Sequence, residues 1–154
     1  MITDASRYYG CVLHQLIDQP DQHVAIQRLN GDVPGFYLVN GNLPFYIKYS
    51  TSRTGPWSFN FQMSHQERQK DLFDTYGECV TAFVCGRDGI AALPYTELQK
   101  VLDDNFELQE GVSIRRRHNQ MYQIKGRNGV LDRKVSRNSL SEILVKYSEG
   151  LTRE

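Results

Sequence analysis

The chain has 154 residues, of which 40% are hydrophobic and 23% are charged, and its formal net charge is zero. These values exclude a disordered chain and fit a domain with a real core, while the net charge identifies no partner. Three cysteines are too few for a disulfide framework. The sequence shows no signal peptide and no membrane-spanning run, so we expect a cytoplasmic protein with reduced thiols.

The first half of the chain predicts a helix followed by three strands. Residues 4–18 place apolar side chains three and four positions apart, which is typical of a helix with one buried face. We expect a short strand within 23–29. Two aromatic and β-branched runs follow at 35–41 and 43–51, and the Asn-Gly-Asn sequence between them predicts a hairpin.

The middle of the chain predicts a strand, a helix and a central strand. Residues 57–62 alternate between apolar and polar side chains, as in a strand with one buried face. Ser64 and Glu67 have the spacing of a capping box, so we expect a helix that begins there and stops at Gly77. Residues 79–86 are almost continuously apolar, which is typical of a strand covered on both faces.

The last third predicts β-hairpins and short helices, and no repeat or linker interrupts it. The sequence therefore predicts a single α/β (α+β) domain over residues 1–154. The expected elements are a strand at 90–95, a helix at 96–104, a hairpin over 112–126, a tight turn at Asn128 and Gly129 leading into 130–135, and a final helix at 141–147.

Apart from the strand piece at 57–62, the elements expected in residues 1–86 come in the order helix, strand, strand, strand, helix, strand. This order resembles the core of the PD-(D/E)xK superfamily, the restriction-endonuclease-like nucleases, with residues 87–154 as a β-rich basic extension. The resemblance implies a catalytic aspartate near the second strand and a Glu-x-Lys on the third. It also implies Mg²⁺ or Mn²⁺, held by the carboxylates and activating a water molecule.

Lys48 lies on the third expected strand, where the resemblance places the catalytic lysine. Tyr46 stands two residues before it, in place of the acidic residue. Asp32 is the candidate metal ligand, while Asn40 is closer to the hairpin but carries an amide. We therefore expect metal-dependent cleavage to be absent or slow. The alternative from the residues alone is a half-exposed strand whose lysine extends its ammonium to water.

Charge is unevenly distributed along the chain. Residues 60–110 carry four basic and ten acidic side chains, whereas residues 111–154 carry ten basic and four acidic ones. A basic end favours a face that binds an anion. The alternative is that the basic end pairs with the acidic middle of the same chain.

Nucleic acid, either DNA or RNA, is the partner that the basic residues favour, because each phosphate contact releases counterions. Strand alternation places Arg115 and Arg117 on one face of the expected hairpin and Arg116 on the other. Tyr122 and His118 are candidates for stacking on bases. The alternative is an edge hairpin that charge protects from aggregation. The candidate phosphate contacts are Lys48, Arg53, Arg115, Arg117, Lys125, Arg127, Arg133 and Lys134.

A second function class also fits the sequence. The chain can be a non-catalytic interaction protein, such as a subunit of a bacterial or phage defence or counter-defence system, with an acidic protein as partner. The sequence also leaves open whether the chain forms a homo-oligomer. The protein interface would then be an aromatic patch formed by Phe36, Tyr37, Phe45 and Tyr46.

Overall fold

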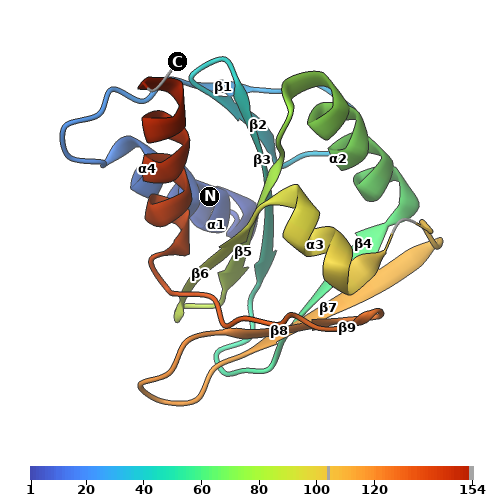
Figure 1. The fold of residues 1–154 in the computed structure, drawn as a ribbon. Coiled ribbons are helices and arrows are strands. Elements are labelled where there is room, and N and C mark those ends of the chain that lie inside the picture. The colour runs from blue at the N-terminus through green and yellow to red at the C-terminus, as the bar shows by residue number, and fades with distance from the viewer. Residues whose placement is uncertain (104, 153–154) are drawn as a thin grey trace.

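The computed structural model describes residues 1–103 and 105–152, which form four helices and nine strands in two sheets (Figure 1). The helices are α1 (Asp4–Ile17), α2 (Met63–Tyr76), α3 (Tyr95–Leu102) and α4 (Ser139–Thr152). The strands are β1 (Ile26–Arg28), β2 (Phe36–Val39), β3 (Leu43–Ser50), β4 (Trp57–Gln62), β5 (Val80–Cys85), β6 (Gly89–Leu93), β7 (Gln109–Arg115), β8 (Gln123–Gly126) and β9 (Gly129–Val130).

The larger sheet has five strands in the order β1-β2-β3-β5-β6 and forms the middle layer of the molecule (Figure 1). Its central pair, β3 and β5, is parallel, and all other neighbours are antiparallel. One face packs against α1 and α4, and the other packs against α2, α3 and the smaller sheet. The expected strands of Tyr37, Ile47 and Val84 thus lie in one sheet, with the two predicted helices packed on it.

Both central strands are buried between these layers. All six residues of β5 are buried, which confirms the prediction from its continuous apolar run. In β3, strand alternation predicts that Phe45, Ile47 and Tyr49 face the core, while Tyr46 shares the half-exposed face of Lys48. That prediction is wrong for Tyr46, which is 3% exposed. The reason is that β4 and α2 cover the face of β3 that the sequence leaves open.

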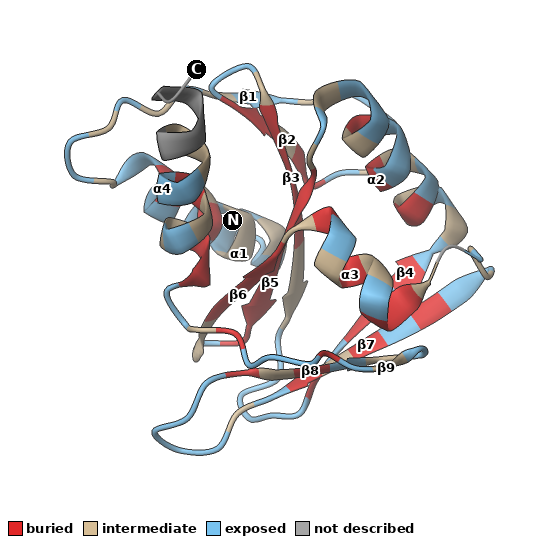
Figure 2. Ribbon diagram, viewed as in Figure 1, coloured by how far each residue is buried: buried red, intermediate tan, exposed pale blue. Residues whose placement is uncertain are grey.

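The smaller sheet has the order β4-β7-β8-β9 and is antiparallel throughout. Its strands alternate between buried and exposed residues, so one face packs inward and the other is open (Figure 2). The predicted hairpin is confirmed as β7 and β8, in which Arg115 pairs with Gln123. The segment expected as a strand at 130–135 is shorter, because β9 ends at Val130 and only a single bridge follows, from Tyr122 to Val135.

Several element boundaries differ from the expected ones. The α2 helix begins at Met63, because Gln62 and His65, and not Ser64 and Glu67, form the capping box. The α3 helix begins at Tyr95 and ends at Leu102, so the expected end at residue 104 lies outside the described residues. The final helix is longer than the sequence predicts. Among the described residues, no helix is both long and apolar enough to span a bilayer.

Candidate functional site

Lys48 lies near the end of β3, beyond the last residue that pairs with β2. Its ammonium nitrogen donates to the backbone oxygen of Asn60 at 2.5 Å. The same nitrogen lies 3.4 Å from the Tyr46 hydroxyl and 3.4 Å from Nδ1 of His65, and 4.7 Å from the centre of the Phe61 ring. Lys48 therefore does not extend into water. It joins β3 to β4 and to the first turn of α2.

The protonation of this group follows from its surroundings. Burial lowers the pKa of Lys48 from 10.5 to about 8. Nδ1 of His65 accepts a hydrogen bond from the backbone N–H of Gln62, so that nitrogen carries the lone pair. The pKa of His65 is lowered by burial and, second, by the charge of Lys48. Burial raises the pKa of Tyr46, so its hydroxyl keeps its proton.

A pocket of about 240 Å³ opens beside Lys48, between α1, the β1–β2 loop and α2. Most of its wall is aromatic or aliphatic. Besides Lys48, the lining residues are Tyr9, Val33, Pro34, Tyr46, Ile47, Tyr49 and His65.

The residues around Lys48 do not fit a divalent metal ion. Tyr46 pairs with Phe36 across β2 and β3, and the two rings stack with centres 4.1 Å apart. Asp32 is exposed in the bends between β1 and β2. Over residues 1–103 and 105–152, no three His, Cys, Asp or Glu side chains form a group that can hold a metal. Hard divalent cations take oxygen ligands, and none of these carboxylates converges on Lys48. Asp32 as a metal ligand stays a prediction.

Part of the predicted basic set gathers on the open face of the smaller sheet. Arg115, Lys125 and Arg127 line one hollow of about 740 Å³. Ser58, Ser113 and Lys125 lie side by side across β4, β7 and β8, so two hydroxyls share this face with the cations. The hollow and the Lys48 pocket have no lining residue in common. The structure therefore separates Lys48 from the arginines with which the sequence groups it.

The three cations of the hollow differ in how far their charge is balanced. Arg115 donates to the amide oxygen of Gln123 at 2.7 Å, which leaves its charge uncompensated. Lys125 has no ion pair with any carboxylate of the described residues. Arg127 forms an ion pair with Glu107 at 3.1 Å. Arg115 and Lys125 are thus the two side chains of this face that are best able to attract an anion.

The other predicted phosphate contacts lie elsewhere. Arg133 donates twice to Glu97, at 2.7 and 3.1 Å, and Lys134 donates to an amide oxygen of the β7–β8 loop. Arg53 and Arg117 are exposed in the β3–β4 and β7–β8 loops. The structure therefore does not bring all eight candidates to one site.

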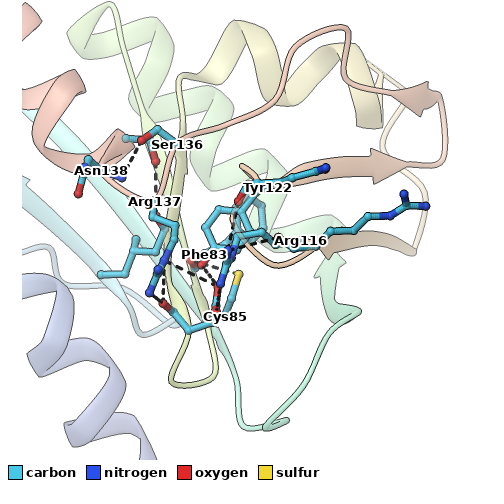
Figure 3. Close-up of polar contacts among 12 residues, drawn as sticks. Phe83, Cys85, Arg116, Tyr122, Ser136, Arg137 and Asn138 are labelled. Atoms are coloured by element: carbon cyan, nitrogen blue, oxygen red, sulfur yellow. Dashed lines mark hydrogen bonds and ion pairs between the residues drawn. The ribbon is translucent and has the colours of Figure 1, made fainter.

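A polar cluster that includes Arg116, Tyr122 and Arg137 fastens the smaller sheet to the larger one (Figure 3). Its centre is Asp88, in the β5–β6 turn. Arg116 donates to both carboxylate oxygens, at 2.8 and 2.9 Å, and the Tyr122 hydroxyl donates at 2.7 Å. Arg137 donates to the Asp88 backbone oxygen. Hydrogen bonds from Arg116 are the largest cause that lowers the pKa of Asp88. The expectation that Tyr122 stacks on bases is wrong, because its side chain is buried in this cluster.

Part of the charge difference between the acidic middle and the basic end is therefore balanced by ion pairs within the chain. Carboxylates of the acidic middle, namely Asp88, Glu97 and Glu107, pair with arginines of the basic end. This confirms the self-pairing alternative for those residues: Arg116, Arg127, Arg133 and Arg137. Among the candidates of the basic end, Arg115, Arg117, Lys125 and Lys134 have no carboxylate partner in the described residues, so the anion-binding alternative is confined to these four.

Sequence reasoning missed His65 and Asp88. The sequence placed His65 within an expected capping motif and Asp88 within an expected turn, and it assigned neither residue a functional role. The two signals available were a histidine at the start of a helix that follows a strand, and a carboxylate in a turn before a run of arginines. Neither reveals a partner 17 or 28 residues away.

No family model and no curated protein sequence matches the chain. Among solved structures, the fold is similar to that of Hjc, a Holliday junction resolvase from the archaeal hyperthermophile Archaeoglobus fulgidus. The TM-score is 0.51 and the sequence identity is 15%, over 72% of this chain and 84% of that one. The chain therefore shares its restriction-endonuclease-like fold with that resolvase, as the order of its elements predicts.

Proposed function

We propose that the protein binds the phosphate backbone of a nucleic acid on the open face of its smaller sheet, and that it does not cut nucleic acid by a metal-dependent reaction. The observation that carries this proposal is the hollow of about 740 Å³, in which Arg115 and Lys125 keep charges that no carboxylate of the described residues balances. Arg127 lines the same hollow but shares its charge with Glu107.

The surface chemistry of the hollow suits a backbone better than bases. The hydroxyls of Ser58 and Ser113 can donate to phosphate oxygens. Gly111 has no side chain, so a nucleic-acid strand can approach the sheet closely there. The aromatic side chains of β4, such as Trp57 and Phe59, are buried on the inner face. Base stacking therefore has no platform on β4, and binding would depend on charge.

Further contacts would come from the loops that border this face. Pro56 lines the hollow, and Arg53 lies three residues earlier in the same exposed loop. Arg117 follows the end of β7 in the β7–β8 loop. We assign Arg53 and Arg117 to flanking phosphate contacts and Arg133 to none, since Glu97 balances its charge. Lys134 donates to the amide oxygen of Gln120 and does not line the hollow, so we leave it out of the proposed contacts.

The absence of cleavage is a proposal about the residues around Lys48. A metal-dependent nuclease needs at least two convergent carboxylates, and stacked Phe36 and Tyr46 occupy the point where β2 meets β3. Cleavage would need ligands from other parts of the chain, and Asp32 is exposed in its loop. The fold of a nuclease would then serve binding alone.

The interaction-protein alternative loses its predicted interface. Phe36, Phe45 and Tyr46 are buried at 1, 0 and 3% exposure, and only Tyr37 of that patch is partly open. An acidic protein remains a partner that the same basic hollow would attract, and the experiment must separate it from nucleic acid.

The test is a salt titration of binding to fluorescent duplex DNA, single-stranded DNA and RNA. Replacing both Arg115 and Lys125 with alanine should reduce the slope of log affinity against log salt by about 2 on duplex DNA, from about 0.9 per contact. Lys146→Ala, which removes one exposed charge on α4, is the matched control and should leave the slope unchanged.

Two results would contradict the proposal. The first is a wild-type protein that binds no nucleic acid at about 50 mM salt, where phosphate contacts are strong. Binding to polyglutamate under the same conditions would then favour the acidic partner. The second is plasmid cleavage with Mg²⁺ or Mn²⁺ that disappears in Lys48→Met, which would establish a metal site at this lysine.

A further inference from the structure

The Lys48 amine has an unusual set of neighbours for a half-buried lysine. Buried ammonium groups are normally paired with a carboxylate, whereas Lys48 meets a backbone carbonyl, an imidazole nitrogen and a phenol. A neutral amine has two N–H donors and one lone pair. The Asn60 oxygen accepts one donor, and Nδ1 of His65, whose lone pair also accepts from the Gln62 N–H, lies 3.4 Å from the amine, which leaves the amine lone pair for a molecule in the pocket.

We propose that Lys48 is a nucleophilic amine that forms an imine with an aldehyde in the pocket beside it, with His65 transferring the proton and Tyr46 polarising the carbonyl. Lysines that are desolvated in apolar pockets act in this way towards carbonyl compounds. This activity goes beyond nucleic-acid binding and does not depend on the basic hollow.

The geometry supplies each group that the reaction needs. The amine nitrogen attacks the carbonyl carbon, and the C=O π electrons move to the oxygen, which receives a hydrogen bond from the Tyr46 hydroxyl. Nδ1 of His65, 3.4 Å from the amine, takes a proton from the nitrogen. It passes that proton to the alkoxide, which gives the carbinolamine, and then carries the second amine proton to the carbinolamine hydroxyl, which leaves as water while the C=N bond forms. One amine and one aldehyde give one imine and one water, so no oxidant or reductant is needed.

The pocket limits the size of the aldehyde. Its volume of about 240 Å³ suits a small molecule, and Tyr9, Tyr49 and Ile47 form a mainly apolar wall. The titratable groups that share the pocket with Lys48 are three tyrosines and His65, and none is a carboxylate. An aldehyde can reach this pocket as a free molecule or as the open sugar of an abasic site in a nucleic acid, so both sources must be tested.

The test is reductive trapping with cyanoborohydride, followed by mass mapping of the adduct over the six lysines of the chain. One arm uses benzaldehyde and the other a duplex with one abasic site. With a pKa of about 8, roughly a tenth of Lys48 is neutral at pH 7, about 300 times the fraction of an ordinary lysine. We expect Lys48 to be labelled at least about tenfold faster than any other lysine, because a lower pKa also makes an amine less nucleophilic.

The control variants separate the site from general lysine reactivity. Lys48→Met should abolish the fast adduct, Lys146→Met on α4 should leave it unchanged, and His65→Gln should slow it with Lys48 still the labelled residue. Fast labelling of Lys48 in either arm supports the proposal and identifies the aldehyde source. Labelling spread evenly over the lysines, or none at Lys48 in both arms, overturns it, and this readout on the wild-type protein needs no variant to fold.

Discussion

Replacing Lys48 with methionine should change the pH dependence of stability in a way that only a desolvated lysine explains. The pKa of Lys48 is about 8 in the folded protein, against 10.5 when exposed. Between these values the unfolded chain binds the proton more tightly than the folded one does. Stability therefore rises with pH across this window, because the folded state is relieved of a charge that it solvates poorly.

The magnitude follows from the two pKa values. One unit corresponds to about 1.4 kcal/mol, and titration from pH 7 to pH 10 covers most of the shift, so wild type should gain about 2–3 kcal/mol relative to Lys48→Met. At pH 7 the variant loses one hydrogen bond to Asn60, worth about 1 kcal/mol, but it also loses the buried charge. We expect the variant to be the more stable protein at pH 7 by about 1–2 kcal/mol.

Urea unfolding of both proteins at pH 7, 8, 9 and 10 measures this difference. Taking wild type minus variant cancels the other titrating groups, as long as they do not contact residue 48. A difference that stays constant from pH 7 to pH 10 would refute the reasoning. It would mean that the amine is hydrated in solution and that its pKa is ordinary.

Three further predictions concern the docking of the smaller sheet. Tyr122→Phe should cost about 1.5–3 kcal/mol of unfolding free energy in a urea titration, since it removes a hydrogen bond to a charged carboxylate. Because the pKa of Asp88 is lowered, wild type should lose stability relative to Asp88→Asn only as the pH falls below about 4, which acid unfolding followed by circular dichroism can measure. Gly126→Ala should lower the thermal midpoint, because a Cβ there would overlap the backbone oxygen of Val101, whereas Gly10→Ala, which meets nothing, should leave the midpoint unchanged or raise it.

The fold could be predicted because its strands and helices carry strong local patterns. The apolar run of β5, the Asn-Gly-Asn turn before β3 and the alternation of β4 each indicate one structure only. What the patterns could not show is which faces of β3 become covered. The local pattern predicts an exposed Tyr46. The residue is buried because β4 and α2, which follow it in the sequence, pack over that face of the sheet.

The candidate site was predicted less completely, because its groups meet through tertiary contacts. Lys48 stands out as a cation in a strand, but nothing in the sequence brings it to His65 or separates it from Arg115. Alternation does show that Arg115 and Arg116 point to opposite faces. It cannot show that Arg116 forms an ion pair with Asp88, since that contact requires the turn between β5 and β6 to lie next to β7.

The two proposed sites are independent, but one strand, β4, contributes residues to both regions. Its Asn60 carbonyl accepts the hydrogen bond from Lys48, while Ser58 on the same strand faces the basic hollow. Stacked aromatic rings fill the point where a metal nuclease would gather carboxylates, so the lysine is left in an apolar pocket and its charge becomes unfavourable. Under the proposed function, phosphate attraction would come from Arg115 and Lys125, which are exposed on the open face of the smaller sheet. Because the Lys48 pocket and the basic hollow have no lining residue in common, binding and amine chemistry can be tested separately in the same chain.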